Sequence, residues 1–305
     1  ISIGPETPAQ GGQSGITGSL VSTYGDNRYG SSIINLHLSG ENNVFTGTSE
    51  IAGDAAYNLV NLTLRNGARW NVVDIGSSND NHVSTLNLDG GILNLRYSAT
   101  RNDPQYKTVH VENLSGNGGL LLFNAELTDS GEQNDRIEVQ NGQAGTHMIH
   151  VTTSSGLEPT KQEMEGYLVR VVNDSGLTFT ADNNRLEMGV YFRDYDVKSR
   201  ISNNGETEWY QAFDPKPAAE SDLPPTAEAV LAMAASGAQN ALYQNNLTDL
   251  RKRLGEVRDG ARDGLWASFS GWQDVLSGYV STRFRQEVYS LSLGLDHAID
   301  DHWLV

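Results

Sequence analysis

Apolar and polar residues alternate in short runs along the N-terminal part of the chain, and glycine follows each run. Leu62 and Leu64, for example, stand one residue apart shortly before Gly67. Four such pairs begin at Leu36, Leu62, Leu86 and Val109, at successive intervals of 26, 24 and 23 residues. Self-similarity with a period of about 20–30 residues is typical of a solenoid, in which each unit buries its apolar face only against its neighbours.

Within each repeat, the pattern favours the coil of a parallel β-helix. Alternate side chains of a strand share one face, so a Leu-x-Leu run fills a narrow core, while glycine takes corner conformations with positive φ. Leucine-rich repeats need a longer leucine-and-asparagine signature that is absent here, and sandwich strands would recur every ~8–12 residues. We therefore predict an all-β fold with a right-handed parallel β-helix over residues 1–120, in which Leu64, Leu88 and Val111 are buried on one face.

From about residue 120, the pattern changes to successive strands separated by turn residues. Asn141-Gly142, which lies between the apolar runs 137–139 and 148–151, is a hairpin signal. The last coil of a solenoid exposes its core and a sheet edge, so a capping element is required there. We predict that residues 121–213 form this cap and the stability core, with Trp209, Tyr191 and Ile149 packed over the last open coil.

A proline-rich linker and a long helix are predicted next. Residues 214–225 hold four of the eight prolines, and a helical pattern that is alanine-rich in its first half follows over residues 226–260. Some thirty helical residues span roughly 45 Å, which is enough to cross a bilayer. The charges of Arg251-Lys252-Arg253 forbid contact with lipid. Such a helix belongs in water or inside a pore; a surface helix or coiled-coil arm is the alternative.

The C-terminal residues 261–305 alternate as transmembrane β-strands do. Leu291, Leu293 and Leu295 alternate with Ser292 and Gly294, which gives one apolar face and one small, polar face. Soluble amphipathic strands alternate too, so this pattern alone leaves the environment open. There is room for only about three strands of some 9–11 residues, so any antiparallel transmembrane β-barrel that starts here is incomplete within the chain.

Composition narrows the function. Asp and Glu number 38 against 21 Lys and Arg, which gives a formal net charge of −17. Such a surface repels phosphate backbones, so we expect no nucleic-acid partner. The chain has no cysteine, which excludes disulfides and thiol chemistry, and no apolar run near eighteen residues. It begins at Ile1 without methionine, which we interpret as an internal or processed piece of a longer protein.

The middle of the chain resembles a known family. The stretch DRIEV at 135–139, with the glycines and apolar residues that follow it, resembles the autochaperone segment of type Va autotransporters with pertactin-like passengers. The resemblance implies a folding core. Its residues are Asp135, Ile137, Val139, Gly145, His147, Ile149, Val151, Tyr191 and Trp209.

The C-terminal motifs follow in the order of the same family's translocator. LRKRLGEVRD (250–259), GLWASFSG (264–271) and FRQEVYSLSLGLDHAI (284–299) resemble its linker helix and opening barrel strands, although the family usually has a basic residue in place of Ser268. The matching residues are Leu250, Arg253, Gly255 and Arg258 in the helix, and Trp266, Phe284, Leu291, Gly294 and Asp296 in the strands. The resemblance covers residues 105–305, whereas residues 1–104 match only as a generic β-helix.

This resemblance implies secretion and display. The cap would fold first outside the cell and template the coils behind it, which would bias movement outward without ATP. The cargo would be a surface-displayed passenger, such as an adhesin or another virulence factor. The implied partners are the outer membrane with its barrel-assembly machinery, periplasmic chaperones and a host-surface ligand. The barrel part would lie in the bacterial outer membrane and the passenger at the cell surface, without any cofactor.

We do not expect an enzyme. The chain has no Gly-x-Ser-x-Gly nucleophile motif. His147 and His150, three apart in a predicted strand, face opposite sides and would not share a metal, so we predict structural histidines and no metal site. A free-standing β-helix enzyme that degrades polysaccharides is the alternative. It needs a groove with clustered carboxylates and basic residues, whereas the acids of residues 1–120 are scattered singly.

Self-cleavage in the predicted helix is a second open alternative. Serine-protease members of the family cut themselves between two asparagines in the linker helix, and this chain has Asn245-Asn246 there. The pair lies about three residues out of register with that motif, which turns it to a different helix face.

Overall fold

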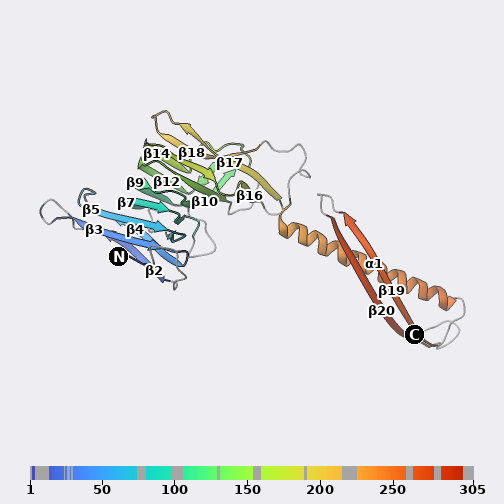
Figure 1. Cartoon of the computed structure of the whole chain (residues 1–305). Helices are drawn as coiled ribbons and strands as arrows, with labels where there is room; N and C mark the ends of the chain where they lie inside the picture. Colours follow the sequence, from blue (N-terminus) through green and yellow to red (C-terminus); the bar gives the residue numbers. More distant parts are fainter. Residues whose placement is uncertain are drawn as a thin grey trace. The chain divides into compact units, whose positions relative to one another are not determined.

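The computed structural model describes residues 2–3, 14–23, 25, 28, 30–73, 80–97, 106–128, 131–153, 159–188, 191–214, 225–258, 264–277 and 283–297. The chain divides into two compact units, residues 1–216 and residues 217–305. The first unit is a β-solenoid with a cap, and the second contains a long helix and a β-hairpin (Figure 1).

The solenoid has two sheets, and successive strands alternate between them. The parallel strands of the first sheet are β1 (Ser2–Ile3), β3 (Ser32–Ser39), β5 (Asn58–Arg65), β7 (Asp80–Asp89), β9 (Thr108–Ser115), β12 (Arg136–Gly142) and β14 (Val169–Asp174). Those of the second are β2 (Ser14–Ser22), β4 (Asn43–Ile51), β6 (Arg69–Val72), β8 (Ile92–Asn94), β10 (Leu120–Thr128), β13 (Gly145–Thr152) and β15 (Leu177–Ala181). The short β11 (Gly131–Asn134) pairs antiparallel with β10. The predicted all-β parallel solenoid is therefore confirmed.

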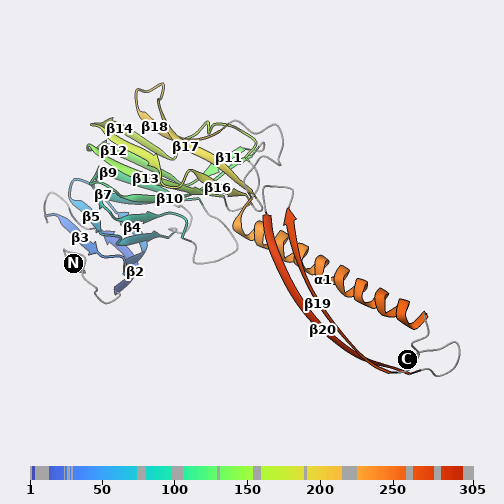
Figure 2. The ribbon, with the colours of Figure 1, turned by 45° about the vertical axis from the view of Figure 1, so that its right-hand side comes forward.

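The strands of neighbouring coils lie side by side (Figure 2), and their inward side chains stack in register and form the core. One column contains Leu36, Leu62, Leu86 and Leu114, and another contains Phe45, Trp70, Leu93, Leu121 and Ile149. Every member of both columns is at most 1% exposed, and Leu64, Leu88 and Val111 are buried as predicted. Each coil therefore gains its stability from the coils on either side.

The predicted start of the fourth repeat at Val109 is wrong. Leu86 pairs with Leu114, and Val111 pairs with Val83, so the repeat unit that follows Leu86 begins at Leu114 and not at Val109. The connection between β8 and β9 is longer than the one between β6 and β7. The apolar pair at 109–111 has the same local pattern as the repeat, but Val111 lies in the column of Val83 and not in that of Leu86.

The coils also continue beyond the predicted boundary at residue 120. Strands β10, β12, β13, β14 and β15 all pair in parallel, so the parallel solenoid extends to Ala181. The predicted hairpin at Asn141-Gly142 is wrong. These two residues end β12, and the next strand, β13, lies in the other sheet. Neither residue has the positive φ that a type I′ hairpin turn requires. Instead, Gly142 is buried at a corner of the coil.

An antiparallel cap follows the last coil. Strand β16 (Arg185–Met188) pairs with β17 (Tyr191–Ile201), and β17 pairs with β18 (Thr207–Phe213). Strand β18 then pairs antiparallel with β14 and covers the free edge of the first sheet. The parallel growth of the solenoid therefore stops at β14, as a capped edge requires.

The second unit begins with the predicted helix. Helix α1 (Ala227–Arg258) starts after Thr226, whose Oγ1 accepts a 3.3 Å hydrogen bond from the Ala229 N–H and caps the first turn. No helix in the described part of the chain is both long and apolar enough to cross a membrane. Residues 215–224, which contain most of the predicted linker, lie outside the described residues.

The hairpin consists of β19 (Gly264–Ser277) and β20 (Arg283–Asp296), paired without interruption from Gly264–Asp296 to Ser277–Arg283. The predicted alternation is present, because Leu291, Leu293 and Leu295 are about equally exposed at 67–70%, whereas Ser292 and Gly294 on the other face are half-buried. The third strand that the sequence leaves room for would lie outside the described residues.

Candidate functional site

Most of the predicted folding-core residues lie in the solenoid coils and not in the antiparallel cap. Ile137 and Val139 in β12, and Ile149 and Val151 in β13, are each at most 1% exposed. Gly145 opens β13 where the backbone of the previous coil passes closely, since a Cβ on Gly145 would lie 2.2 Å from the Gly116 carbonyl oxygen. These residues therefore stabilise the last coils from within.

Asp135 fixes the entry to β12. Its side chain is fully buried, and its Oδ1 accepts a 2.9 Å hydrogen bond from the Lys107 N–H while Oδ2 accepts a 2.6 Å bond from the Asn124 N–H. The Asp135 N–H in turn donates to the Asn124 carbonyl oxygen at 2.9 Å. A buried carboxylate needs such donors, so this residue locks one corner of the coil to two neighbouring segments.

His147 and His150 face opposite sides of β13, as predicted. His147 is fully buried, and its Nδ1 accepts a 3.1 Å hydrogen bond from the Gly119 N–H. Burial lowers the pKa of His147 to about 4, so the ring is neutral at physiological pH. His150 lies on the outer surface with its Nδ1 3.5 Å from an Asp182 carboxylate oxygen. Both positions fit structural roles.

Of the three residues predicted to pack over the last coil, Trp209 does so. Trp209 on β18 packs edge-on against Phe179 of the last coil, with ring centroids 5.4 Å apart. Tyr191 is half-buried at the first position of β17, and Ile149 lies inside a coil. Tyr195 and Phe179 are buried aromatic residues of the cap and the last coil that sequence reasoning missed. The alternation of Arg193, Tyr195 and Val197 along β17 was the available signal for Tyr195.

Two arginines attach the segment 159–168 to the cap. Arg200 donates to the carbonyl oxygens of Met164 at 3.0 Å and Gly166 at 2.9 Å. The buried Arg193 donates at 3.2 Å each to the carbonyl oxygens of Pro159 and Asp214. These charge-assisted hydrogen bonds to backbone oxygens make this irregular segment part of the folded unit.

The predicted helix and hairpin residues can be placed only partly. Leu250, Arg253, Gly255 and Arg258 lie on the backbone of α1, and their side chains are outside the described part of the structure, as are those of Phe284 and Asp296. Trp266 on β19 lies opposite Gly294 on β20, and its ring covers the glycine. Asn245 and Asn246 lie within α1 without described side chains, so self-cleavage stays a prediction.

A polar groove that the sequence did not reveal crosses the outer face of the first sheet. In each of four neighbouring strands, one residue has no paired residue in the adjacent strand. These residues are Ser84, Glu112, Gln140 and Val172. On either side of the unpaired residue, the buried side chains of one strand are three residues apart instead of two, as Val111 and Leu114 are in β9. The extra residue bends each strand at the same place. Outside the bend lies a groove of about 310 Å³.

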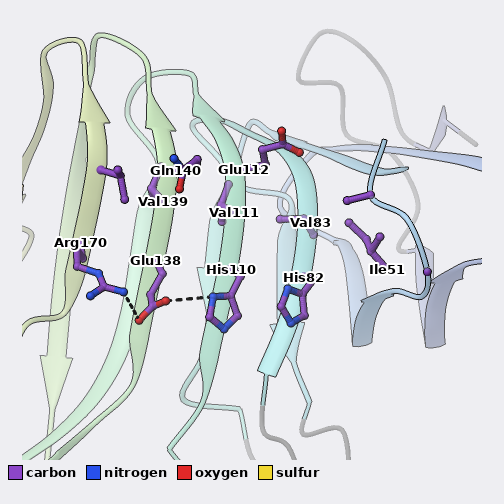
Figure 3. A pocket seen from close by; sticks show the side chains of 13 residues that line it. Ile51, His82, Val83, His110, Val111, Glu112, Glu138, Val139, Gln140 and Arg170 are labelled. Carbon is purple, nitrogen blue, oxygen red and sulfur yellow. Dashed lines mark ion pairs between the residues drawn. The ribbon is translucent and has the colours of Figure 1, made fainter. Parts of the chain in front are cut away.

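One wall of the groove is a charged and aromatic ladder of His82, His110, Glu138 and Arg170, one residue from each of four coils (Figure 3). Arg170 Nη2 lies 2.9 Å from Glu138 Oε1, and Glu138 Oε2 lies 3.2 Å from His110 Nδ1. His110 stacks on His82 with ring centroids 4.5 Å apart. In addition to the backbone pairing of the strands, the ladder therefore links four coils through side-chain contacts.

Glu138 at the centre of the ladder is held in its charged form. The Tyr167 hydroxyl donates a 2.6 Å hydrogen bond to Glu138 Oε1. Partial burial opposes ionisation, but this hydrogen bond and the charge of Arg170 outweigh it and lower the pKa of Glu138. A carboxylate held in this way is poorly suited to donate a proton as a general acid.

Comparison with known proteins reveals relatives of this fold. A family model described as Pertactin matches residues 83–212, which include the last coils and the cap. The pertactin autotransporters of Bordetella bronchiseptica and Bordetella parapertussis are each 24% identical to the chain over alignments that cover 79% of it. The chain is similar to pertactin-type autotransporters. It spans 30% and 31% of the length of these two relatives.

A solved structure, that of the Haemophilus influenzae Hap adhesin, aligns with this chain at a TM-score of 0.39 and 20% identity. The alignment covers 66% of this chain and 22% of the adhesin.

Proposed function

We propose that this chain forms the junction between an autotransporter passenger and its translocator, and that its cap drives the folding of the passenger during secretion. The observation that carries the proposal is the change of topology after Ala181. All coils before it are parallel, whereas β16, β17 and β18 form an antiparallel meander that pairs with the last coil through β14.

The order of folding follows from the distance along the chain between paired strands. The cap strands pair with their sequence neighbours, whereas paired residues of the coil strands are 23–35 residues apart along the chain. Local pairing costs less loop-closure entropy and forms faster. Once β18 and β14 have paired, β14 offers a fixed parallel edge to β12, and each earlier coil then adds to the one behind it.

The second unit supports a position at the outer membrane. Leu265, Phe269 and Leu293 are 68–81% exposed on one face of the hairpin. Ser268 and Ser292, which are small and polar, lie on the opposite face. We assign the apolar face to lipid and the small face to a barrel lumen that holds helix α1. The partners of this part would be the outer membrane, its barrel-assembly machinery and periplasmic chaperones.

For the displayed part, we propose an adhesin-like role, which the similarity to pertactin autotransporters supports, and a ligand at the host surface. We propose that the segment has no catalytic activity. Glu138 is the carboxylate best placed in the groove, and the Arg170 ion pair and the Tyr167 hydrogen bond already occupy it. A polysaccharide-degrading enzyme would need a proton donor beside a second, free carboxylate.

Folding kinetics test the templating role with a matched pair of substitutions. Val197→Ala lies in the cap strand β17 and Val60→Ala in the coil strand β5, and both side chains are at most 7% exposed. If the cap folds first, Val197→Ala slows refolding of the chain, whereas Val60→Ala mainly accelerates unfolding. Stopped-flow refolding and unfolding in urea measure both rates. The opposite assignment of the two effects would refute templating by the cap.

A further inference from the structure

We propose that the groove on the first sheet binds a linear, uncharged oligosaccharide. The inference starts from the groups that the groove leaves free. Glu112 and Gln140 are exposed, and their side chains make no hydrogen bond or ion pair with the described residues. The ring of His82 is stacked on His110 but also makes no hydrogen bond within the described part of the chain. Together these side chains offer both hydrogen-bond donors and acceptors.

The free groups lie beside a rigid wall. Arg170, Glu138 and His110 are bound to one another, and Arg170 Nη1 also lies 3.7 Å from Glu206 Oε2. The ladder is therefore fixed before any ligand arrives, which reduces the entropy lost on binding. Neighbouring coils repeat about every 4.8 Å, so the groove presents polar side chains at a regular spacing to a ligand that is itself repetitive.

A peptide is a poor fit to this surface. Extended peptides bind at the edge of a sheet, where free N–H and C=O groups pair with them. The groove lies in the interior of the sheet, and two of the backbone oxygens freed by the bend are already occupied. Asn113 Nδ2 donates to the Ser84 carbonyl oxygen and Asn141 Nδ2 to that of Glu112, both at 3.2 Å.

Charge disfavours an anionic ligand. Glu112 and Glu138 line the groove, Asp80 lies 3.7 Å from the His110 ring, and Arg170 is already paired. The formal net charge of −17 adds to the repulsion of phosphate, sulfate or uronate groups. An uncharged ligand that is rich in hydroxyl groups matches the remaining donors and acceptors.

The apolar residues at the rim fit the same ligand. Ile51 lies beyond His82 at one end, and Val172 is 37% exposed beside Arg170 at the other. Sugar rings carry C–H faces as well as hydroxyl groups, so they can contact both kinds of side chain. Among the described residues, the lining contains no tryptophan, tyrosine or phenylalanine on which a sugar ring would stack. We therefore expect weak binding, with a Kd of about 1 mM.

The test uses the full chain in micelles of a zwitterionic detergent, which has no sugar headgroup to compete. Cellotetraose, maltotetraose and xylotetraose are titrated separately, with binding measured by saturation-transfer NMR. At least one should bind with a Kd of about 1 mM, and Glu112→Ala with Gln140→Ala should weaken it about tenfold. The matched control is Glu187→Ala with Gln133→Ala, which removes an exposed pair of the same types outside the groove and should leave binding unchanged.

Three results would overturn the proposal. The first is no binding of any of the three tetrasaccharides at 10-fold the expected Kd, about 10 mM. The second is equal affinity of the groove variant and the control variant. The third is that tetralysine or tetragalacturonate binds the groove more tightly than every neutral sugar. None of these results bears on the order of folding, so the junction proposal would stand or fall separately.

Discussion

The hydroxyl oxygen of Tyr195 accepts a 3.0 Å hydrogen bond from the backbone N–H of Val151. Tyr195 belongs to the cap strand β17 and Val151 to the coil strand β13, 44 residues earlier. Both residues are at most 2% exposed. Burial raises the pKa of Tyr195 to about 12, so the hydroxyl is neutral at physiological pH. A single side chain thus satisfies a buried backbone donor of the coil with an acceptor from the cap.

Removing this hydroxyl should destabilise the solenoid. Tyr195→Phe leaves the Val151 N–H buried without a partner, which costs about 1–3 kcal/mol of unfolding free energy. Equilibrium urea denaturation, followed by circular dichroism, measures the loss. Tyr191→Phe is the matched control, because the Tyr191 hydroxyl makes no hydrogen bond with the described residues, and it should change stability by less than about 0.5 kcal/mol. Equal effects of the two substitutions would contradict this role of Tyr195.

The close packing of one coil on the next gives a second prediction. Gly145→Ala would place a Cβ 2.2 Å from the Gly116 carbonyl oxygen, a backbone atom that cannot rotate away. We expect a loss of about 1–3 kcal/mol, as for overpacked cores. Gly15→Ala in β2 is the control, since nothing lies within 4 Å of its added Cβ. Thermal unfolding of both variants distinguishes them, and a stable Gly145→Ala variant would show that the coils can move apart.

The sequence predicted which residues form the columns of the core better than it predicted where the parallel coils end. Leu62 and Leu64 alternate inward because a strand has a period of two, and that signal is local. The parallel pairing of β13 with β15 is not local, because Gly145 and Leu177 are 32 residues apart and lie in coils of unequal length. The glycine at position 142 therefore looked like a hairpin turn, although it is the corner of a coil.

The groove could not have been predicted for the same reason. His82, His110, Glu138 and Arg170 are separated by 28, 28 and 32 residues, so the sequence scatters groups that the register brings side by side. In the sequence, the acids of residues 1–120 are therefore only scattered singly. Only the register of the parallel strands reveals that they form one wall.

The buried His147 should make stability depend on pH. Its pKa is about 4 in the folded chain against 6.5 for an unperturbed histidine, so the unfolded state binds a proton more readily. The stability that this residue contributes is complete above pH 6.5 and is lost as the pH falls towards 4, by about 3 kcal/mol in all. Urea denaturation from pH 7.5 to pH 4 measures the slope.

The variant His147→Gln isolates that contribution. It removes the titrating ring, so the loss of stability between pH 6.5 and pH 4 should become smaller than in the parent chain. His37→Gln, which changes an exposed histidine on β3, should leave the pH profile as it is. If the stability of His147→Gln falls with pH as steeply as that of the parent chain, the acid sensitivity comes from other groups.

The two faces of the hairpin should respond differently to charge. Leu293 on β20 is 68% exposed on the apolar face, and Ser292 beside it lies on the small, polar face opposite Ser268. If the apolar face contacts lipid, Leu293→Arg costs about 2–4 kcal/mol of membrane insertion near the bilayer centre, whereas Ser292→Arg is tolerated. Co-sedimentation of the chain with phosphatidylcholine vesicles measures the difference. Since each 1.4 kcal/mol is a factor of ten, we expect partitioning of Leu293→Arg to fall about thirtyfold or more, and an equal response of both variants would place the hairpin outside the membrane.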